Sequence, residues 1–330
     1  MKGKLWAALR PWLGLALGGA LLWFSLRDVA PGLPQALGQA HWLWVALTWA
    51  SVLLCTLVGA RRWQGLLRSA GVPLSFGRAL AIYAVGQMGN AILPSRLGDL
   101  ARAYLAGGTP SNALLALGTV VVEKALDGLV LVSMVVALAL TVALPEWFRS
   151  AALLFVGVLA VLAVLVAAVT WGAGRLEGLV QRLPPRWRRA ALGGLQGLGV
   201  LRRGGRLGAI GGLTLLLWLL STATNLLLFR AFDLPLSLAA ALLLLVTIYM
   251  GSLVRVVPGQ LGVFHYLTII SLAVFGIVRE AALPYALVLH LLVYGTIALF
   301  GAGGLWGLSL SWGALQRELA GAAQRLRSAS

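Results

Sequence analysis

Long, uninterrupted apolar segments recur along almost the whole chain, and they constrain its fold more than any other feature. They lie at roughly 12–29, 42–60, 76–93, 111–144, 150–172, 208–230, 236–257, 259–277 and 281–312. An α-helix needs about 20 apolar residues to cross the hydrocarbon core of a membrane. A transmembrane β-barrel would instead show short segments of alternating polarity. We therefore expect an all-α polytopic membrane protein that forms a single membrane domain over residues 1–330.

Charge is scarce in this sequence and strongly one-sided. Only 11% of the residues are charged, and 26 Lys and Arg stand against 9 Asp and Glu, which gives a net charge of +17. In a soluble protein such an excess would suggest nucleic acid, but in a membrane protein it marks the cytoplasmic loops, so we expect no nucleic-acid partner. The single cysteine, Cys55, lies in an apolar segment. We therefore expect neither a disulfide framework nor a metal site, and no cofactor.

The basic segments orient the chain in the membrane. They are the N-terminus (Lys2, Lys4, Arg10), the joint with Arg61, Arg62 and Arg68, the linker 173–207, and the tail with Arg317, Arg325 and Arg327. The positive-inside rule places all of them, including both termini, on the cytoplasmic side of a multi-pass protein of the inner (plasma) membrane. Residues 12–26 lack a clean cleavage site and are interpreted as a first anchor rather than a signal peptide.

The linker 173–207 contains the stretch "RWRRAALGGLQGLGVL", whose leucines are spaced as on one helical face. One interpretation is an interfacial helix that binds anionic leaflet lipids through the basic residues of 175–206. The other is a topology signal that happens to be helical. The sequence leaves both open.

An internal repeat divides the rest of the chain. "GVPLSFGRALAIYAVGQMGNAILPSRLGDL" at 71–100 resembles "DLPLSLAAALLLLVTIYMGSLVRVVPGQLGVF" at 233–264, and both stretches contain PLS, then MG, then PxxLG. The preceding segments "WASVLLCTLVGARRW" and "WLLSTATNLLLFRAF" also correspond. These ordered matches indicate a duplication, with a first repeat at 42–172 and a second at 208–312.

The basic loops predict that the two repeats are inverted relative to each other. Segment 42–60 must run inward to the Arg61 joint, whereas the matching segment 208–230 runs outward from the basic linker. The later loops stay inside only if each PxxLG unit contributes an even number of crossings. The simplest arrangement is about six full spans plus two broken, re-entrant helical hairpins. Pro94 and Gly98 would break the first hairpin, and Pro258 and Gly262 the second.

Polar residues concentrate around the first break and in the segment that follows it. The set is Gln87, Asn90, Arg96, Asp99 and Arg102, followed in "GTVVVEKALDGLVLV" by Glu123, Lys124 and Asp127. A charge at the bilayer midplane costs about 3 kcal/mol, so we expect these acids to pair with Arg96 and Arg102 as a charge network. Such a network is either purely structural or lines a substrate path, and the first break could also be a loop in cytoplasmic water. In the second repeat, Arg255 and His265 flank the break, and His290 occupies a place comparable to that of Glu123.

Three stretches of the sequence resemble the lysylphosphatidylglycerol synthase/flippase transmembrane-region family, and the resemblance extends over nearly the whole chain. The stretches are "ARRWQGLLRSAGVPLSFGRALAIYAVGQMGNAILPSRLGDLARAYL", "VVVEKALDGLVLV" and "VPGQLGVFHYLTIISLAVFGI". The resemblance implies a flippase-like fold that moves lipids or lipid-linked carriers between leaflets. Lys124 stands where the family usually has Arg, and His265 where it usually has Glu. The second change removes an acid and argues against a cationic head group. We see no globular stretch that would form a soluble aminoacyl-transfer domain.

Three functions follow from these features. The first is a transporter that binds a phospholipid or polyprenyl-phosphate-linked lipid through Arg96, Arg102, Arg255, Gln87, Asn90 and His265. Its candidate groups include four bases and three acids, so the expected head group is an anionic phosphate. The second is a membrane-embedded transferase that uses a polyprenyl phosphate, but the sequence shows no recognisable catalytic arrangement. The third is a non-transporting scaffold. We expect the transporter, and no enzyme.

Overall fold

The fold is all-helical wherever the structure describes it. The computed structural model describes residues 16, 18–27, 30–93, 97–171, 188, 207–252 and 257–313, and within these ranges all regular structure is helix. This confirms the predicted all-α class. Pro94, Arg96, Arg255, nearly all of the linker 173–207 and both termini lie outside the described residues, so the expected interfacial helix stays a prediction.

The helices follow one another through the chain with short connections. After a helical stretch at 18–26 come η1 (Ala30–Gly32), α2 (Leu33–Gly38), α3 (Trp42–Ser69), α4 (Phe76–Ile92), α5 (Leu97–Gly107), α6 (Pro110–Thr141), α7 (Glu146–Trp171), α10 (Leu207–Ala231), α11 (Leu238–Gly251), η5 (Pro258–Gln260), α12 (Val263–Ala273) and α13 (Arg279–Gly307). Among the described residues, α3, α10 and α13 are each long and apolar enough to cross a membrane. These helices confirm the expected membrane class.

Side-chain caps set the start of two helices near the predicted charge network. Ser75 precedes α4 and accepts a hydrogen bond from the backbone N–H of Arg78 at 3.4 Å. Thr109 precedes α6 and accepts one from the N–H of Asn112 at 3.4 Å, while Pro110 occupies the first helical turn, where its missing donor costs nothing. These caps fix where α4 and α6 begin, and so fix which residues of α6 face inward.

Helix α3 corrects one sequence expectation. Arg61, Arg62 and Arg68 were predicted to form a polar joint after residue 60, but α3 continues without interruption to Ser69. Its 28 residues span about 42 Å, which exceeds the roughly 30 Å hydrocarbon core. Arg62 is only 1% exposed and points into the protein. A basic pair therefore does not mark a loop here, because one of its members is buried against acids of another helix.

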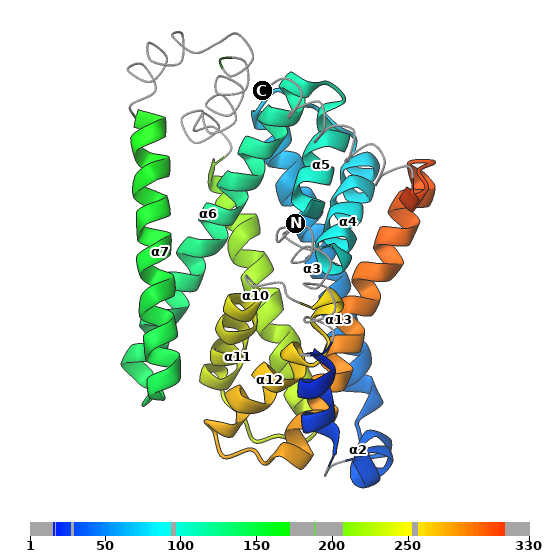
Figure 1. Ribbon diagram of the computed structural model, residues 1–330, viewed down its shortest axis with the longest axis vertical. Helices are drawn as coiled ribbons and strands as arrows, with labels where there is room; N and C mark the ends of the chain where they lie inside the picture. Colours follow the sequence, from blue (N-terminus) through cyan, green and yellow to red (C-terminus); the bar gives the residue numbers. More distant parts are fainter. Residues whose placement is uncertain are drawn as a thin grey trace, which may run out of the picture.

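The two short-helix pairs lie at opposite ends of the molecule (Figure 1). Helices α4 and α5 occupy the upper part of the view, whereas α11 and α12 occupy the lower part, and the long α3 and α10 pass between them. One core cluster packs α3, α4, α5 and α6 around Trp63, Ile82 and Ala103. A separate core cluster packs α10, α11, α12 and α13 around Leu244 and Tyr285. The two pairs thus pack mainly into different apolar clusters.

Small and hydroxylated side chains bring α3 and α10 together. The Ser51 hydroxyl donates to the carbonyl of Leu220 at 3.1 Å, and the Thr224 hydroxyl donates to Ser51 at 2.9 Å. One turn further along α3, the thiol of Cys55 lies 3.7 Å from the hydroxyl of Ser221. Such contacts are typical of helices that associate inside a membrane, where small residues allow close approach.

Two glycines of the repeated PxxLG motif permit close backbone approaches. A Cβ at Gly98 would collide with the carbonyl oxygen of Gly86, so α5 crosses α4 with almost no separation. Gly262 has φ +79° and a Cβ there would collide with the carbonyl oxygen of Gly18, in the first described helical stretch. The same motif therefore packs against its own short-helix partner in one copy and against the N-terminal helix in the other.

Candidate functional site

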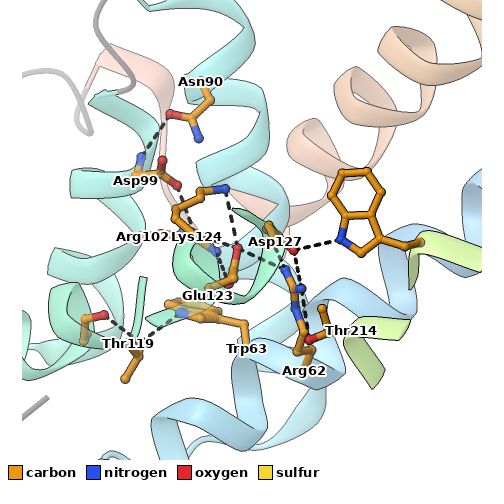
Figure 2. A network of polar contacts seen from close by, with 12 residues as sticks. Arg62, Trp63, Asn90, Asp99, Arg102, Thr119, Glu123, Lys124, Asp127 and Thr214 are labelled. Atoms are coloured by element: carbon orange, nitrogen blue, oxygen red, sulfur yellow. Dashed lines mark hydrogen bonds and ion pairs between the residues drawn. The ribbon is translucent and has the colours of Figure 1, made fainter. Parts of the chain in front are cut away.

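One face of α6 supplies the acids of a buried charge cluster. Thr119, Glu123 and Asp127 follow one another at intervals of four residues, so their side chains share a face of the helix. The Thr119 hydroxyl accepts a hydrogen bond from the Trp63 indole at 3.2 Å, and the two acids are 2% and 5% exposed. Figure 2 shows this face directed toward α3 and α5.

Arg102 of α5 is fully buried and pairs with the first of these acids, Glu123. Its two terminal nitrogens each donate to one oxygen of Glu123 at 3.1 Å, and it also pairs with Asp99 at 3.0 Å. Its guanidinium lies 5.0 Å from the ring centre of Trp63 and 5.5 Å from that of Tyr83. The bidentate geometry and the aromatic faces compensate for the loss of water around a cation that is 0% exposed.

The second acid of the α6 face pairs with Arg62 of α3. Arg62 donates to both oxygens of Asp127, at 2.6 and 3.2 Å, and lies 3.5 Å from Glu123. The indole of Trp218, from α10, also donates to Asp127 at 3.3 Å. Asp127 therefore joins three helices that are far apart in the sequence (Figure 2).

A side chain of α4 caps the first turn of α5. The Asn90 amide oxygen accepts a hydrogen bond at 3.1 Å from the backbone N–H of Asp99, a donor that has no partner within its own helix. Asp99 lies in the first turn, where its negative charge complements the helix dipole. The beginning of α5 is thus held against α4 by Asn90, and Asp99 is neutralised by Arg102 of the same helix.

A central cavity opens beside the charge cluster. Its volume is about 340 Å³, at the lower end of the range for ligand sites. Its wall comes from both halves of the chain: α3, α4, α6, α10, α11, α12 and α13 all contribute residues. The ionic or amide groups on the wall are Arg62, Gln87, Glu123, Lys124, Asp127 and Asn225, and the rest is mainly apolar or hydroxylated. The cavity therefore offers a polar end and a larger apolar surface.

Apart from His265, which is described below, the structure separates the predicted binding and charge-network residues into three groups. Gln87, Glu123, Lys124 and Asp127 lie on the cavity wall. Asn90, Asp99 and Arg102 lie behind it, committed to the contacts described above and not among the lining residues. Arg96 and Arg255 lie outside the described residues. Arg102, which was predicted to bind the substrate, is paired with Asp99 and Glu123 in this conformation, and its predicted role stays a prediction.

Arg62 is the site residue that sequence reasoning missed. Asp127 was expected to pair with Arg96 or Arg102, whereas its partner is Arg62. A signal was present in the helical spacing, since Gly59, Arg62, Trp63 and Leu66 fall on one face of α3 and all four are buried. The adjacent Arg61 hid it, because two neighbouring arginines resemble a topology signal.

His265 and His290 of the second repeat lie side by side, away from any acid of the cluster. Their ring centres are 4.8 Å apart, and His290 also stacks on Tyr294 at 4.4 Å. The His290 Nε2 lies 2.8 Å from the carbonyl oxygen of Gly259, so the ring holds the turn at η5 against α13. The break residue Gly262 precedes α12, and Pro258 begins η5, whereas Gly98 is the second residue of α5.

Comparison with known families places most of the chain in one family of membrane proteins. A family model described as the lysylphosphatidylglycerol synthase TM region matches residues 12–301. The chain belongs to this family. The match includes every helix that lines the cavity, up to position 301 of α13. Comparisons with curated proteins and with solved structures returned no match. The family confirms the suspected resemblance and a location in the membrane.

Proposed function

We propose that this protein moves a lipid with an anionic, phosphate-bearing head group between the leaflets of the inner membrane. The lipid is a phospholipid or a polyprenyl-phosphate-linked lipid. The observation that carries the proposal is the cavity of about 340 Å³, which joins the buried charge cluster to an apolar wall formed by both halves of the chain. A charged head group needs a polar environment to cross the membrane, whereas the tails of the lipid can stay in the hydrocarbon core.

Lys124 is the cation that we assign to the head group. The six charged groups of the described cluster balance, with Arg62, Arg102 and Lys124 against Asp99, Glu123 and Asp127. The excess positive charge predicted from the sequence depended on Arg96 and Arg255, so it no longer carries the argument. The assignment now depends on Lys124, which lies on the cavity wall with 34% of its side chain exposed. Its neighbour Glu123, 3.7 Å away, is already paired with Arg102.

The two short-helix pairs support a transport mechanism by re-entrant hairpins in inverted repeats. Helices α4, α5, α11 and α12 have 17, 11, 14 and 11 residues, or about 26 Å at most, which is too short to cross the core. They lie at opposite ends of the molecule (Figure 1). Helices α3 and α10, which precede them in the two sequence repeats, pack along each other. We propose that the hairpins enter from opposite faces and that their relative movement exposes the cavity alternately.

Transport fits this site better than catalysis does. The acids on the cavity wall, Glu123 and Asp127, are both held by arginines, so neither is placed as a general acid or base. A scaffold would not need a polar cavity between the two halves. The paired acids support a role in holding the cations in place, and the cavity supports a substrate.

The test is transport of fluorescent phosphatidylglycerol in liposomes that contain the purified protein. Lys124→Met should lower the initial rate by about tenfold or more, because the neutral side chain keeps the length but loses the ionic contact. Arg149→Met is the matched control, since Arg149 pairs with Glu146 on the exposed surface of α7 at 3.6 Å, away from the cavity. Equal rates for the two variants, or no transport by the wild type, would refute the proposal.

A further inference from the structure

The turn at 258–262 and the start of α12 contain buried polar groups that have no hydrogen-bond partner in the part of the chain that the structure describes. Gln260 is 3% exposed, and neither its amide oxygen nor its amide nitrogen makes a hydrogen bond. His265 is 2% exposed, and its Nδ1 likewise has no hydrogen-bond partner. The two residues are five positions apart in the chain, at the end of η5 and near the start of α12.

Such groups destabilise the conformation in which they are found. Buried polar atoms are almost always paired, because an amide removed from water without a replacement bond loses its full hydration. Gln260 is also in the left-handed region, with φ +53°, which disfavours side chains other than glycine. Glycine would fit this backbone conformation better, and an apolar side chain of similar length would avoid the cost of the unpaired amide. The amide therefore serves a state in which it has a partner.

His265 lies against Phe264, a wall residue of the central cavity, and the carbonyl of Gly259, next to Gln260 in the chain, lies 2.8 Å from the Nε2 of the neighbouring His290. Phe264 and Leu289 line the cavity, and their neighbours in the chain are His265 and His290. The Phe264 ring packs edge-on against both imidazoles, with centre distances of 6.0 Å to His265 and 5.1 Å to His290. Phe264 thus forms part of the cavity wall on one side and contacts the two imidazoles on the other.

We propose that Gln260 and His265 form a second binding site, here called the second station, for the phosphate of the transported lipid, in addition to the contact with Lys124. In this conformation Phe264 closes the second station off from the cavity. This inference rests on the proposed function and adds the second end of the path. The Gln260 amide nitrogen can donate to a phosphate oxygen, and so can the His265 Nδ1 when it carries the proton. Neither group is paired with a carboxylate, so an anion meets no repulsion from a bound acid. The head group passes from Lys124 to this station when Phe264 moves aside.

The experiment compares two substitutions that each remove a buried, unpaired polar group. Gln260→Met removes the amide of the station. Thr247→Val is the control, because the Thr247 hydroxyl on α11 is also buried without a partner but does not line the cavity. For each full-length protein we would measure the apparent Tm, the transport rate of fluorescent phosphatidylglycerol in liposomes, and the Kd of radiolabelled phosphatidic acid in detergent.

Both variants should have a Tm at or above that of the wild type, because each loses an unsatisfied group. Gln260→Met should nevertheless lose about tenfold in transport rate and in affinity for phosphatidic acid, while Thr247→Val keeps both. Wild-type rate and Kd in Gln260→Met would overturn the station, as would a loss accompanied by a lower Tm. If the wild type does not transport but Gln260→Met still loses affinity, the proposed function falls and the station stands. Competition by inorganic phosphate as strong as that by the lipid would overturn the lipid assignment.

Discussion

The α4–α5 pair and the α11–α12 pair share a sequence motif but are held by different forces. In the first pair, α5 is tied to α6 by the bidentate Arg102–Glu123 contact and to α4 by Asn90 and Gly98. In the second pair, the described residues contain no ion pair between α12 and its neighbours. Ring contacts among Phe264, His265 and His290 take that place.

This difference suggests a division of roles. A buried bidentate ion pair has one good geometry, and separating it leaves two charges without water, so it fixes α5 in position. Aromatic contacts tolerate sliding, because an edge-on or an offset arrangement stabilises nearly equally. We infer that the first pair holds a fixed site for the head group and that the second pair moves. Four substitutions test this comparison, from the largest expected effect to the smallest.

Arg102→Ala should have the largest effect. It leaves Glu123 buried with only Arg62 and Lys124 nearby and removes the partner of Asp99, and breaking a buried ion pair typically costs about 3–5 kcal/mol. Thermal unfolding in detergent measures this loss, with Arg149→Ala on the exposed surface as the control. A Tm close to that of the control would mean that the first pair is not fixed by its charges.

Gly98→Ala should be the next most damaging change. The added methyl collides with the backbone of α4 at Gly86, where no side chain can move aside, so the two helices must separate. Overpacking of this kind costs about 1–3 kcal/mol. Gly71→Ala gives a useful contrast, because Gly71 has φ +86° but open space around its Cβ position. If Gly98→Ala unfolds at no lower temperature than Gly71→Ala, the close approach of α5 to α4 costs no more than the backbone strain at Gly71, and close packing does not hold this pair.

Arg102→Lys should have a smaller effect than Arg102→Ala. The ammonium keeps the charge but makes one contact where the guanidinium makes two, and it loses the planar stacking against Trp63 and Tyr83. We expect a loss of about 1–2 kcal/mol in unfolding free energy and partial recovery of transport relative to the alanine variant. Full recovery would show that charge alone matters at this position.

His265→Phe should have the smallest effect on stability. The phenyl ring keeps the contacts with Phe264 and His290 and removes a buried nitrogen without a partner, so the change in unfolding free energy should stay below about 1 kcal/mol. A loss as large as that of Arg102→Ala would show that the second pair is held as rigidly as the first, and the proposed division of roles would be wrong.

The sequence predicted the class of fold and, except for Arg62, the residues that form the described cluster, but not all of their partners. Runs of apolar residues set the helices, since each must satisfy its own backbone within lipid. Spacing along α6 placed Glu123 and Asp127 on one face. The pairing of Asp127 with Arg62 could not be predicted, because it depends on how α3 and α6 cross, 65 positions apart in the chain.

The sequence predicted a polar cavity in the membrane, but not the apolar residues from both halves of the chain that form most of its wall, nor the second polar station. Gln260 stands within the PxxLG motif, where its neighbours suggested only a turn, and its lack of a partner is a property of packing. His265 was expected near the break, and the structure adds that it lies against His290. The repeat in the sequence indicates which segments correspond. It does not indicate that ion pairs hold the α4–α5 pair in place while ring contacts hold the α11–α12 pair.

The most direct test of the central claim is the sign of the charge that the cavity accepts. Liposomes containing the wild-type protein would be loaded with fluorescent phosphatidylglycerol or with its lysylated derivative at equal concentration, and the initial rates of transfer between leaflets would be compared. Lys124 on the cavity wall, beside acids already engaged by arginines, predicts faster transfer of the anionic lipid. Faster transfer of the cationic, lysylated lipid would contradict the account.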